Sequence, residues 1–271
     1  MTVLVQLSDP HFGTERPGVV QALREWVHAQ SPDVLVLSGD ITQRATRRQF
    51  ASARAFMDSL AVPHSLVIPG NHDIPLFALW TRVLSPYGRY RQAFGPDLRP
   101  TLDLPGCLVL GLNTTRWWRH KDGQISRDQV ERIAARLRRA SPAQLRVVVV
   151  HQPVAVIRPE DRANLQHGHA RAIARWAEAG ADLILGGHIH LPYALQLPTP
   201  RPLWAVQAGT ALSRRVRSGT PNSVNLIRGP VMGANGSRHC TLERWDYAAA
   251  SSAFEQAETR TLTLAPLSTS A

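Results

Sequence analysis

The sequence predicts an α/β fold in which a parallel sheet is covered by helices and a second, more antiparallel sheet follows. Up to Leu191, short apolar runs of strand length alternate with helix-like segments, which is typical of a parallel sheet. After Leu191, strand-like runs follow one another with only turn residues between them. The 271 residues contain no tandem repeat or linker, so we expect one domain over residues 1–254 and a flexible, Thr/Ser/Ala-rich tail over residues 255–271.

The expected elements follow from local signals. Pro17 suits the first position of a helix, Ser126 suits an N-cap, and Gly180 suits a helix end. The helices are expected at Pro17–Gln30, Thr46–Leu60, from the cap Ser126 to Arg139, and at Ala170–Ala179. The strands of the alternating part are expected at Val3–Leu7, Asp33–Leu37, Ser65–Ile68, Cys107–Leu112, Val147–Val150 and Asp182–Leu185. The later strands are expected at Tyr193–Leu197, Leu203–Gln207, Ser223–Ile227 and Arg238–Trp245.

The composition is that of a globular protein with an unusual charge. Hydrophobic residues make up 44% and charged residues 19%, which excludes general disorder. The net charge of +11 indicates either an anionic partner or a compositional bias, since 30 of the 31 basic residues are Arg and Lys121 is the single Lys. The Arg residues are scattered, so we expect no specific nucleic-acid binding. Peripheral contact with an anionic membrane stays open, as does the oligomeric state.

The chain carries no sign of an oxidising or membrane compartment. Cys107 and Cys240 have neither metal-like nor redox-like spacing. Residues 1–8 lack the features of a signal peptide, and no run approaches the roughly 18 apolar residues of a membrane span. We therefore expect a cytoplasmic protein.

Polar side chains follow five of the expected strands. They are Asp9 with His11, Asp40, Asn71 with His72 and Asp73, His151, and His188 with His190. Taken singly, each has an ordinary alternative as a cap, a turn or a buried hydrogen-bonded His. The carboxyl ends of parallel strands form the ligand crevice of an α/β sheet, so these groups should meet at one edge. Without a metal, they would leave buried polar groups and repelling carboxylates, which is costly.

The types of side chain favour particular metals. Carboxylate, imidazole and amide groups without thiolate suit Mn, Fe or Zn rather than a Cys-rich structural zinc site. This many ligands require two ions, and a carboxylate between them can bridge both. The sequence therefore predicts a dinuclear centre.

The motifs D-x-H, G-D, G-N-H-D, a lone H and G-H-x-H occur in this order, and with them the chain resembles the calcineurin-like metallophosphoesterase family over roughly Val3 to Trp245. The pattern is most similar to class III cyclic-nucleotide phosphodiesterases and related bacterial phosphodiesterases. The resemblance implies a double β-sheet sandwich flanked by helices (αββα). It also implies that one metal is held by Asp9, His11 and His190, the other by Asn71, His151 and His188, and that Asp40 bridges them.

The resemblance gives His72 a different role. It implies that this side chain is not a ligand but faces the substrate phosphate, as a proton donor to the leaving oxygen or as a charge stabiliser. The implied nucleophile is a hydroxide that bridges the metals, which lower the pKa of its parent water. Asp73 either orients His72 or is an ordinary residue at the start of a helix.

Three further segments bear on the substrate. The loop Asn113–His120 follows a strand, and the resemblance places it near the metals, so Asn113 and Arg116 are candidate substrate contacts, with exposed loop residues as the alternative. Ile74–Phe94 is either a helix packed on the sheet or an aromatic cap over the site. His167 and His169 imitate a metal pair but follow a polar stretch, and we expect them outside the ligand set.

The sequence thus predicts a metal-dependent phosphodiesterase. The expected substrate is a small soluble diester, such as a cyclic nucleotide, because arginines interrupt the apolar positions of Ile74–Phe94 and would break a lipid channel. One alternative is a pyrophosphate or phosphodiester hydrolase acting on a lipid precursor such as UDP-diacylglucosamine. Another is a non-catalytic scaffold of the same fold, which the complete ligand set argues against.

Overall fold

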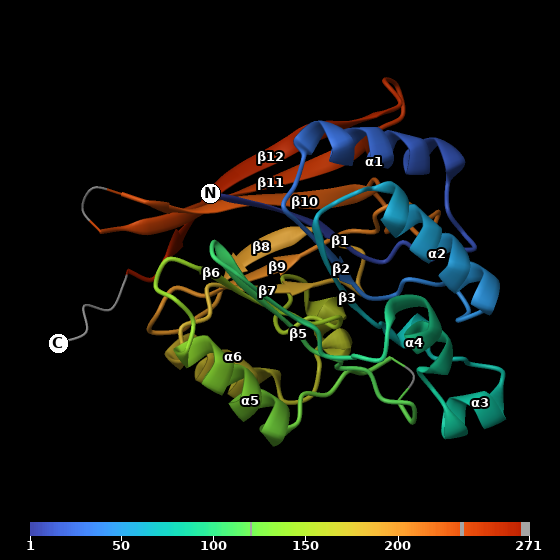
Figure 1. The fold of residues 1–271 in the computed structure, drawn as a ribbon, viewed down its shortest axis with the longest axis horizontal. Coiled ribbons are helices and arrows are strands. Elements are labelled where there is room, and N and C mark those ends of the chain that lie inside the picture. The colour runs from blue at the N-terminus through green and yellow to red at the C-terminus, as the bar shows by residue number, and fades with distance from the viewer. Residues whose placement is uncertain (120, 234–235, 267–271) are drawn as a thin grey trace.

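The computed structural model describes residues 1–119, 121–233 and 236–266 (Figure 1). In these ranges the chain forms two six-stranded sheets that pack face to face, with helices on the two outer faces. The predicted αββα sandwich is therefore confirmed. None of the described helices is long and apolar enough to cross a membrane.

The first sheet has the strand order β12-β11-β10-β1-β2-β3. Its parallel part, β1 to β3, comes from the N-terminal segment, and its antiparallel part comes from the C-terminal segment. The strands are β1 (Thr2–Leu7), β2 (Val34–Ser38), β3 (His64–Ile68), β10 (Ser223–Met232), β11 (Arg238–Ala248) and β12 (Ala253–Leu264).

The second sheet has the order β4-β5-β6-β7-β9-β8, with parallel pairing from β5 to β9 and an antiparallel strand at each edge. The strands are β4 (Thr101–Leu104), β5 (Cys107–Gly111), β6 (Leu145–Val149), β7 (Leu183–Gly186), β8 (Tyr193–Gln196) and β9 (Trp204–Gln207).

Three of the described helices begin where the sequence provides a start signal. Pro17 is the first residue of α1 (Pro17–Gln30), and capping boxes at Thr46 and Ser126 begin α2 (Arg47–Ser59) and α5 (Arg127–Arg138). The remaining helices are α3 (Leu79–Leu84), α4 (Gly88–Phe94), α6 (His169–Glu178) and the 3₁₀ turns η1 (Asn71–Asp73) and η2 (Pro159–Asn164).

Three hydrophobic clusters hold the layers together. The middle cluster lies between the sheets and joins residues such as Val36 of β2 with Val147 of β6. The first outer cluster joins α1 and α2 to the first sheet, and the second joins α5 and α6 to the other sheet. Along β1, Leu4 belongs to the middle cluster and Val5 to the outer one, because successive side chains of a strand point to opposite faces.

Two expectations about the C-terminal part are wrong. The strands after Leu191 do not form a sheet of their own, because β8 and β9 extend the second sheet whereas β10 to β12 extend the first. The expected flexible tail is a strand as far as Leu264, paired with β11 over its whole length. Phe254 and Leu262 of β12 are buried, which explains why this segment is ordered. Residues 267–271 lie outside the described part of the chain.

Candidate metal centre

The ligand candidates lie on tight turns directly after strands of both sheets. The turns after β1, β2 and β3 belong to the first sheet, and those after β6 and β7 belong to the second. Five candidates have left-handed backbone conformations, with φ of 50° at Asp9, 44° at His11, 47° at Asp40, 74° at His188 and 54° at His190. Such conformations are uncommon for residues other than glycine and cluster at functional sites, where the surrounding structure enforces them.

Two glycines allow these turns to approach each other. A Cβ atom at Gly70 would collide with the backbone and carboxylate of Asp40, and one at Gly187 would collide with Ser8 and Asp9. The backbone of each glycine turn therefore contacts the neighbouring turn directly, with no room for a side chain between them. Glycine is the residue that permits such close contact.

The first group of possible ligands comprises Asp9, His11 and His190, whose ligand atoms lie within 4.8 Å of one another. Asp9 Oδ1 lies 3.3 Å from His190 Nε2 and 3.8 Å from His11 Nε2. The two imidazole Nε2 atoms are 3.1 Å apart. Two ring nitrogens and one carboxylate oxygen thus converge on one small volume, as the ligands of a metal ion do.

The second group comprises Asp40, His151 and His188. Asp40 Oδ1 lies 3.2 Å from His151 Nε2, and the same nitrogen lies 3.2 Å from the amide oxygen of Asn71. Asp40 also lies next to the first group, because its Oδ2 atom is 3.7 Å from His11 Nε2. The two groups are therefore adjacent, and the carboxylate of Asp40 lies between them.

Backbone carbonyls orient two of the imidazoles. His151 Nδ1 lies 2.8 Å from the carbonyl oxygen of Ser38, and His190 Nδ1 lies 2.5 Å from that of Arg215. A carbonyl oxygen only accepts, so each Nδ1 carries a proton and each Nε2 points into the cluster. This arrangement is typical of metal-bound His, in which the second ring nitrogen donates to a fixed acceptor.

Burial and charge set the protonation of the cluster. Burial lowers the pKa of His11 to about 3 and that of His188 to about 4, so both rings are neutral near pH 7. Burial opposes ionisation of Asp9, but His190 and His151 outweigh it and lower the pKa of Asp9 to about 2. Burial likewise opposes protonation of His151, but Asp40 outweighs it and raises its pKa to about 9, so this ring is charged near pH 7 and would release its Nε2 proton on binding a metal. Neutral imidazoles and ionised carboxylates are the forms that bind metal.

Two atoms of the cluster lack any hydrogen-bond partner among the described residues. They are Asp9 Oδ1 and His188 Nδ1, and both are buried. An unpaired buried acceptor is costly, and a buried anion more so. The donor set therefore fits two metal ions, which would take up both atoms.

His72 lies beside the cluster and faces an arginine that sequence analysis did not single out. Its Nδ1 donates to the carbonyl oxygen of Gln43 (3.1 Å), and its Nε2 lies 3.1 Å from Arg215 Nη1. Arg215 follows β9, which pairs with β7, so it reaches the same edge as His188 and His190. The expected strand Leu203–Gln207, which ends at the same edge of the sheet, was the feature of the sequence that could have pointed to Arg215. His72 also shares a possible ligand group with His11 and Asp40, so its ring lies close to the other candidate ligands.

Asp73 contacts the backbone rather than the ring of His72. Its buried carboxylate accepts hydrogen bonds from the amides of Ile41, Thr42 and Gly70 and from the Thr42 hydroxyl, at 2.8–3.0 Å. Asp73 therefore fastens the turn after β3 to the turn after β2. It positions His72 and Asn71 through the main chain.

A comparison with known protein families identifies the family of this chain. The family model described as calcineurin-like phosphoesterase matches residues 2–192, which contain all seven ligand candidates. The chain belongs to this family. A probable cyclic nucleotide phosphodiesterase of Synechococcus sp. is similar to this phosphoesterase, with 28% identity over 165 residues. The alignment covers 59% of this chain and 59% of that protein.

Solved structures share the fold of this phosphoesterase at low sequence identity. A dimetal phosphatase from Danio rerio has a TM-score of 0.66 and 14% identity, with 97% of this chain and 99% of that chain covered. Purple acid phosphatase PPD1 from yellow lupin has a TM-score of 0.68 and 12% identity, covering 97% of this chain and 53% of that one. These likenesses show the fold alone, so function has to be argued from the side chains.

The two candidate substrate contacts of the phosphoesterase have their polar groups occupied within their own loop. Arg116 donates to the carbonyl oxygens of Asn113 and Thr115 and to Gln129. The amide oxygen of Asn113 accepts from the backbone and hydroxyl of Thr115. These contacts favour a structural role, and substrate binding by Asn113 and Arg116 stays a prediction. His120, at the end of this loop, lies outside the described residues.

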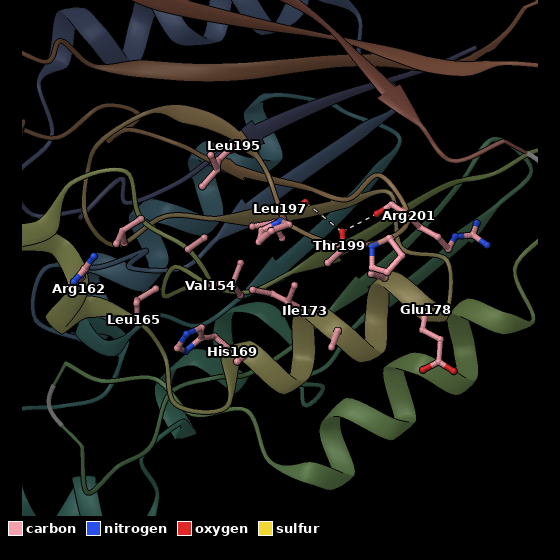
Figure 2. Close-up of a pocket in the computed structure, with 17 residues that line it drawn as sticks. Val154, Arg162, Leu165, His169, Ile173, Glu178, Leu195, Leu197, Thr199 and Arg201 are labelled. Atoms are coloured by element: carbon pink, nitrogen blue, oxygen red, sulfur yellow. Dashed lines mark hydrogen bonds between the residues drawn. The ribbon is translucent and has the colours of Figure 1, made fainter.

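His167 and His169 lie outside the three ligand groups found among the described residues. His167 contacts Arg119 and Asp122, and His169 Nδ1 contacts the carbonyl oxygen of Gln166. His169 also lines an apolar cavity of about 780 Å³ between α6 and the segment Leu195–Arg201 (Figure 2). None of the seven ligand candidates lines this cavity.

A smaller cavity opens directly on the cluster. It has a volume of about 260 Å³ and is lined by Gln43, Arg44, Asn71, His72, Ile74, Leu76 and Arg215. Pockets that enclose a whole organic ligand have volumes of about 300–1,000 Å³. This cavity therefore suits a phosphoryl group, flanked by two guanidinium groups, while the rest of a larger substrate would extend over the surface.

Proposed function

We propose that this phosphoesterase hydrolyses a phosphodiester with two metal ions, of the Mn, Fe or Zn type. The observation that carries the proposal is the pair of adjacent ligand groups that meet at Asp40. Asp9, His11 and His190 would hold one ion, Asn71, His151 and His188 the other, and Asp40 would contact both. Bound there, the ions would supply a Lewis acid to the phosphoryl oxygens and would lower the pKa of a nearby water.

The chain's own residues supply the remaining steps. Arg215 and Arg44 line the cavity and are placed to bind the nonbridging phosphate oxygens, since guanidinium groups pair well with phosphate. In the free protein Arg215 donates to His72 Nε2. When phosphate draws the guanidinium away, His72 can hold a proton at Nε2 and donate it to the leaving oxygen as the P–O bond breaks.

The proposed substrate is a cyclic nucleotide or a similar small soluble diester. The resemblance to a probable cyclic nucleotide phosphodiesterase supports this substrate class, as does a cavity that fits a phosphoryl group and little more. A second candidate is a phosphate ester or pyrophosphate of a lipid precursor. The observation in its favour is the set of apolar side chains exposed in Phe77–Leu84, next to the cavity.

A turnover panel with metal-reconstituted protein tests the proposal. The panel contains bis- and mono-p-nitrophenyl phosphate, cyclic nucleotides, glycerophosphodiesters and UDP-diacylglucosamine. We expect hydrolysis of diesters, loss of activity on chelation and recovery with Mn²⁺, Fe²⁺ or Zn²⁺. Two bound metals without turnover of any member would contradict the proposed activity, and preference for the lipid-linked substrate would favour the second candidate.

A further inference from the structure

The helix α3 exposes almost all of its apolar side chains. Trp80 is 82% exposed, Leu84 77% and Leu79 67%, and no residue of the helix is buried. Phe77, just before the helix, is 76% exposed. A surface helix of a globular protein normally buries an apolar stripe against the core. Of the two alternatives for Ile74–Phe94, a helix packed on the sheet does not describe α3, although Tyr90 of α4 is buried.

A second pair of exposed aromatic residues is joined to this helix. Trp117 and Trp118 are both exposed and contact each other edge to face. Their loop is connected to α3 because Arg82 donates to the carbonyl oxygen of Arg119. Together they form an apolar patch, which we call the docking patch: Phe77, Leu79, Trp80, Val83, Leu84, Trp117 and Trp118. Large exposed patches of this kind mark interaction surfaces.

The two segments that carry the docking patch contain several basic residues and no acidic ones. The sequence has no acidic residue between Asp73 and Asp97, and none between Asp103 and Asp122. Arg82, Arg89, Arg91, Arg116, Arg119 and Lys121 lie in these two segments. Arg44 lies over the ring of Phe77 at 5.0 Å. Asp122, which follows the second segment, is paired with Arg119 at 3.6 Å.

We propose that the docking patch binds the surface of an anionic lipid bilayer. Exposed Trp, Phe and Leu side chains enter the interfacial layer of a membrane, and flanking arginines bind its negative head groups. A second copy of this chain fits poorly, because a twofold interface would place the same arginines against each other. An acidic protein partner would match the charge but is not needed to explain the aromatic and aliphatic side chains.

Binding in this way would place the catalytic cavity at the lipid surface. Ile74 and Leu76, which line that cavity, immediately precede Phe77 of the docking patch. The proposal concerns where the protein binds and does not depend on the identity of the substrate. Membrane binding and hydrolysis can therefore be tested separately.

Cosedimentation with vesicles tests the docking patch. One set of vesicles contains phosphatidylcholine alone, and the other contains equal parts of phosphatidylcholine and phosphatidylglycerol. We expect the wild type to bind the anionic vesicles and to dissociate as salt is raised, because salt screens the arginines. The Trp80→Ser/Leu84→Ser variant should bind at least about tenfold more weakly, because two large apolar side chains no longer enter the interface.

The Ile157→Ser/Met232→Ser variant is the matched control, because it also removes two exposed apolar side chains but lies outside the docking patch. It should bind like the wild type. Both variants should hydrolyse bis-p-nitrophenyl phosphate at the wild-type rate, so loss of vesicle binding is distinguished from loss of the active site. The proposal is overturned if the wild type does not bind anionic vesicles, if both variants lose binding equally, or if sedimentation shows a dimer that only Trp80→Ser/Leu84→Ser dissociates.

Discussion

At the scale of single residues, the carboxylate of Asp40 lies between the two ligand groups. Its Oδ1 faces His151 and its Oδ2 faces His11. The same Oδ1 also accepts a hydrogen bond from the backbone amide of His72, at 2.8 Å. One carboxylate therefore links both ligand groups to the main chain of the proposed proton donor.

We expect Asp40→Ala to lose most of its metal and nearly all of its turnover, because neither ion keeps its shared ligand. Metal content per chain, measured by elemental analysis, and turnover of bis-p-nitrophenyl phosphate check this. Asp122→Ala removes a carboxylate at the surface and should leave both quantities unchanged. Two metals per chain with normal turnover in Asp40→Ala would contradict the bridging role.

His72 should matter for rate and not for metal content. We expect His72→Ala to keep close to the wild-type metal content and to lose about 10²–10⁴-fold in turnover, as is typical of removing an acid catalyst. The loss should be smaller for p-nitrophenyl esters, whose leaving group needs no proton, than for alkyl esters. His169→Ala is the control for losing an imidazole. If metal content falls as far as activity in His72→Ala, His72 is a ligand.

At the scale of elements, strand ends were predictable and loop contacts were not. Asp9, Asp40 and His151 directly follow apolar runs, so sequence alone placed them at the ends of strands. Arg215 comes eight positions after β9, and its approach to His72 depends on how the intervening loop folds. The positions of β8 and β9 in the second sheet are likewise set by pairing across the molecule, which local sequence does not encode.

The loop that carries Arg215 is fixed by specific contacts. Thr210 donates to the carbonyl oxygen of Asp9, and Asn222 donates to the carbonyl oxygens of Thr210 and Ser213. Arg217 donates to both oxygens of the buried Asp161, at 2.9 and 3.0 Å, and to the carbonyl oxygen of Ile189. The loop is thus fastened both to the turn that carries Asp9 and to the turn that carries His188 and His190.

We expect Arg217→Ala to lower kcat/KM by about tenfold, because Arg215 and the carbonyl that orients His190 lose their support. It should also lower the free energy of unfolding by about 1–3 kcal/mol, since the carboxylate of Asp161 loses its donor. Denaturant titration and steady-state kinetics measure both effects. Arg214→Ala removes an exposed arginine of the same loop and should change neither. Unchanged kinetics in Arg217→Ala would show that the loop keeps its shape without this contact.

At the scale of the whole molecule, the centre requires both sheets in a fixed relative position. Asp40 and Asn71 follow strands of the first sheet, whereas His151 and His188 follow strands of the second. The sequence motifs indicated the family and therefore the sandwich, but composition and periodicity alone indicated only parallel and antiparallel strands. The contacts between the sheets come from residues far apart in the chain, which local patterns do not reveal.

A buried ion pair that is not part of the ligand cluster joins the two sheets. Arg238 of β11 contacts both carboxylate oxygens of Asp182, just before β7, at 3.1 Å. Arg238 also donates to the carbonyl oxygens of Gln144 and Ala265, so it connects four segments. Both side chains of the pair are fully buried.

We expect Arg238→Ala to lower the free energy of unfolding by about 3–5 kcal/mol, because Asp182 becomes an uncompensated buried charge. Arg238→Met/Asp182→Leu should be clearly more stable than Arg238→Ala, because a buried pair replaced by apolar side chains of similar size no longer leaves a charge behind. Denaturant unfolding of the metal-free protein measures both. Arg54→Ala, which breaks an exposed pair with Asp58, should cost at most about 1 kcal/mol. If Arg238→Ala costs no more than Arg54→Ala, the ion pair does not hold the sheets together.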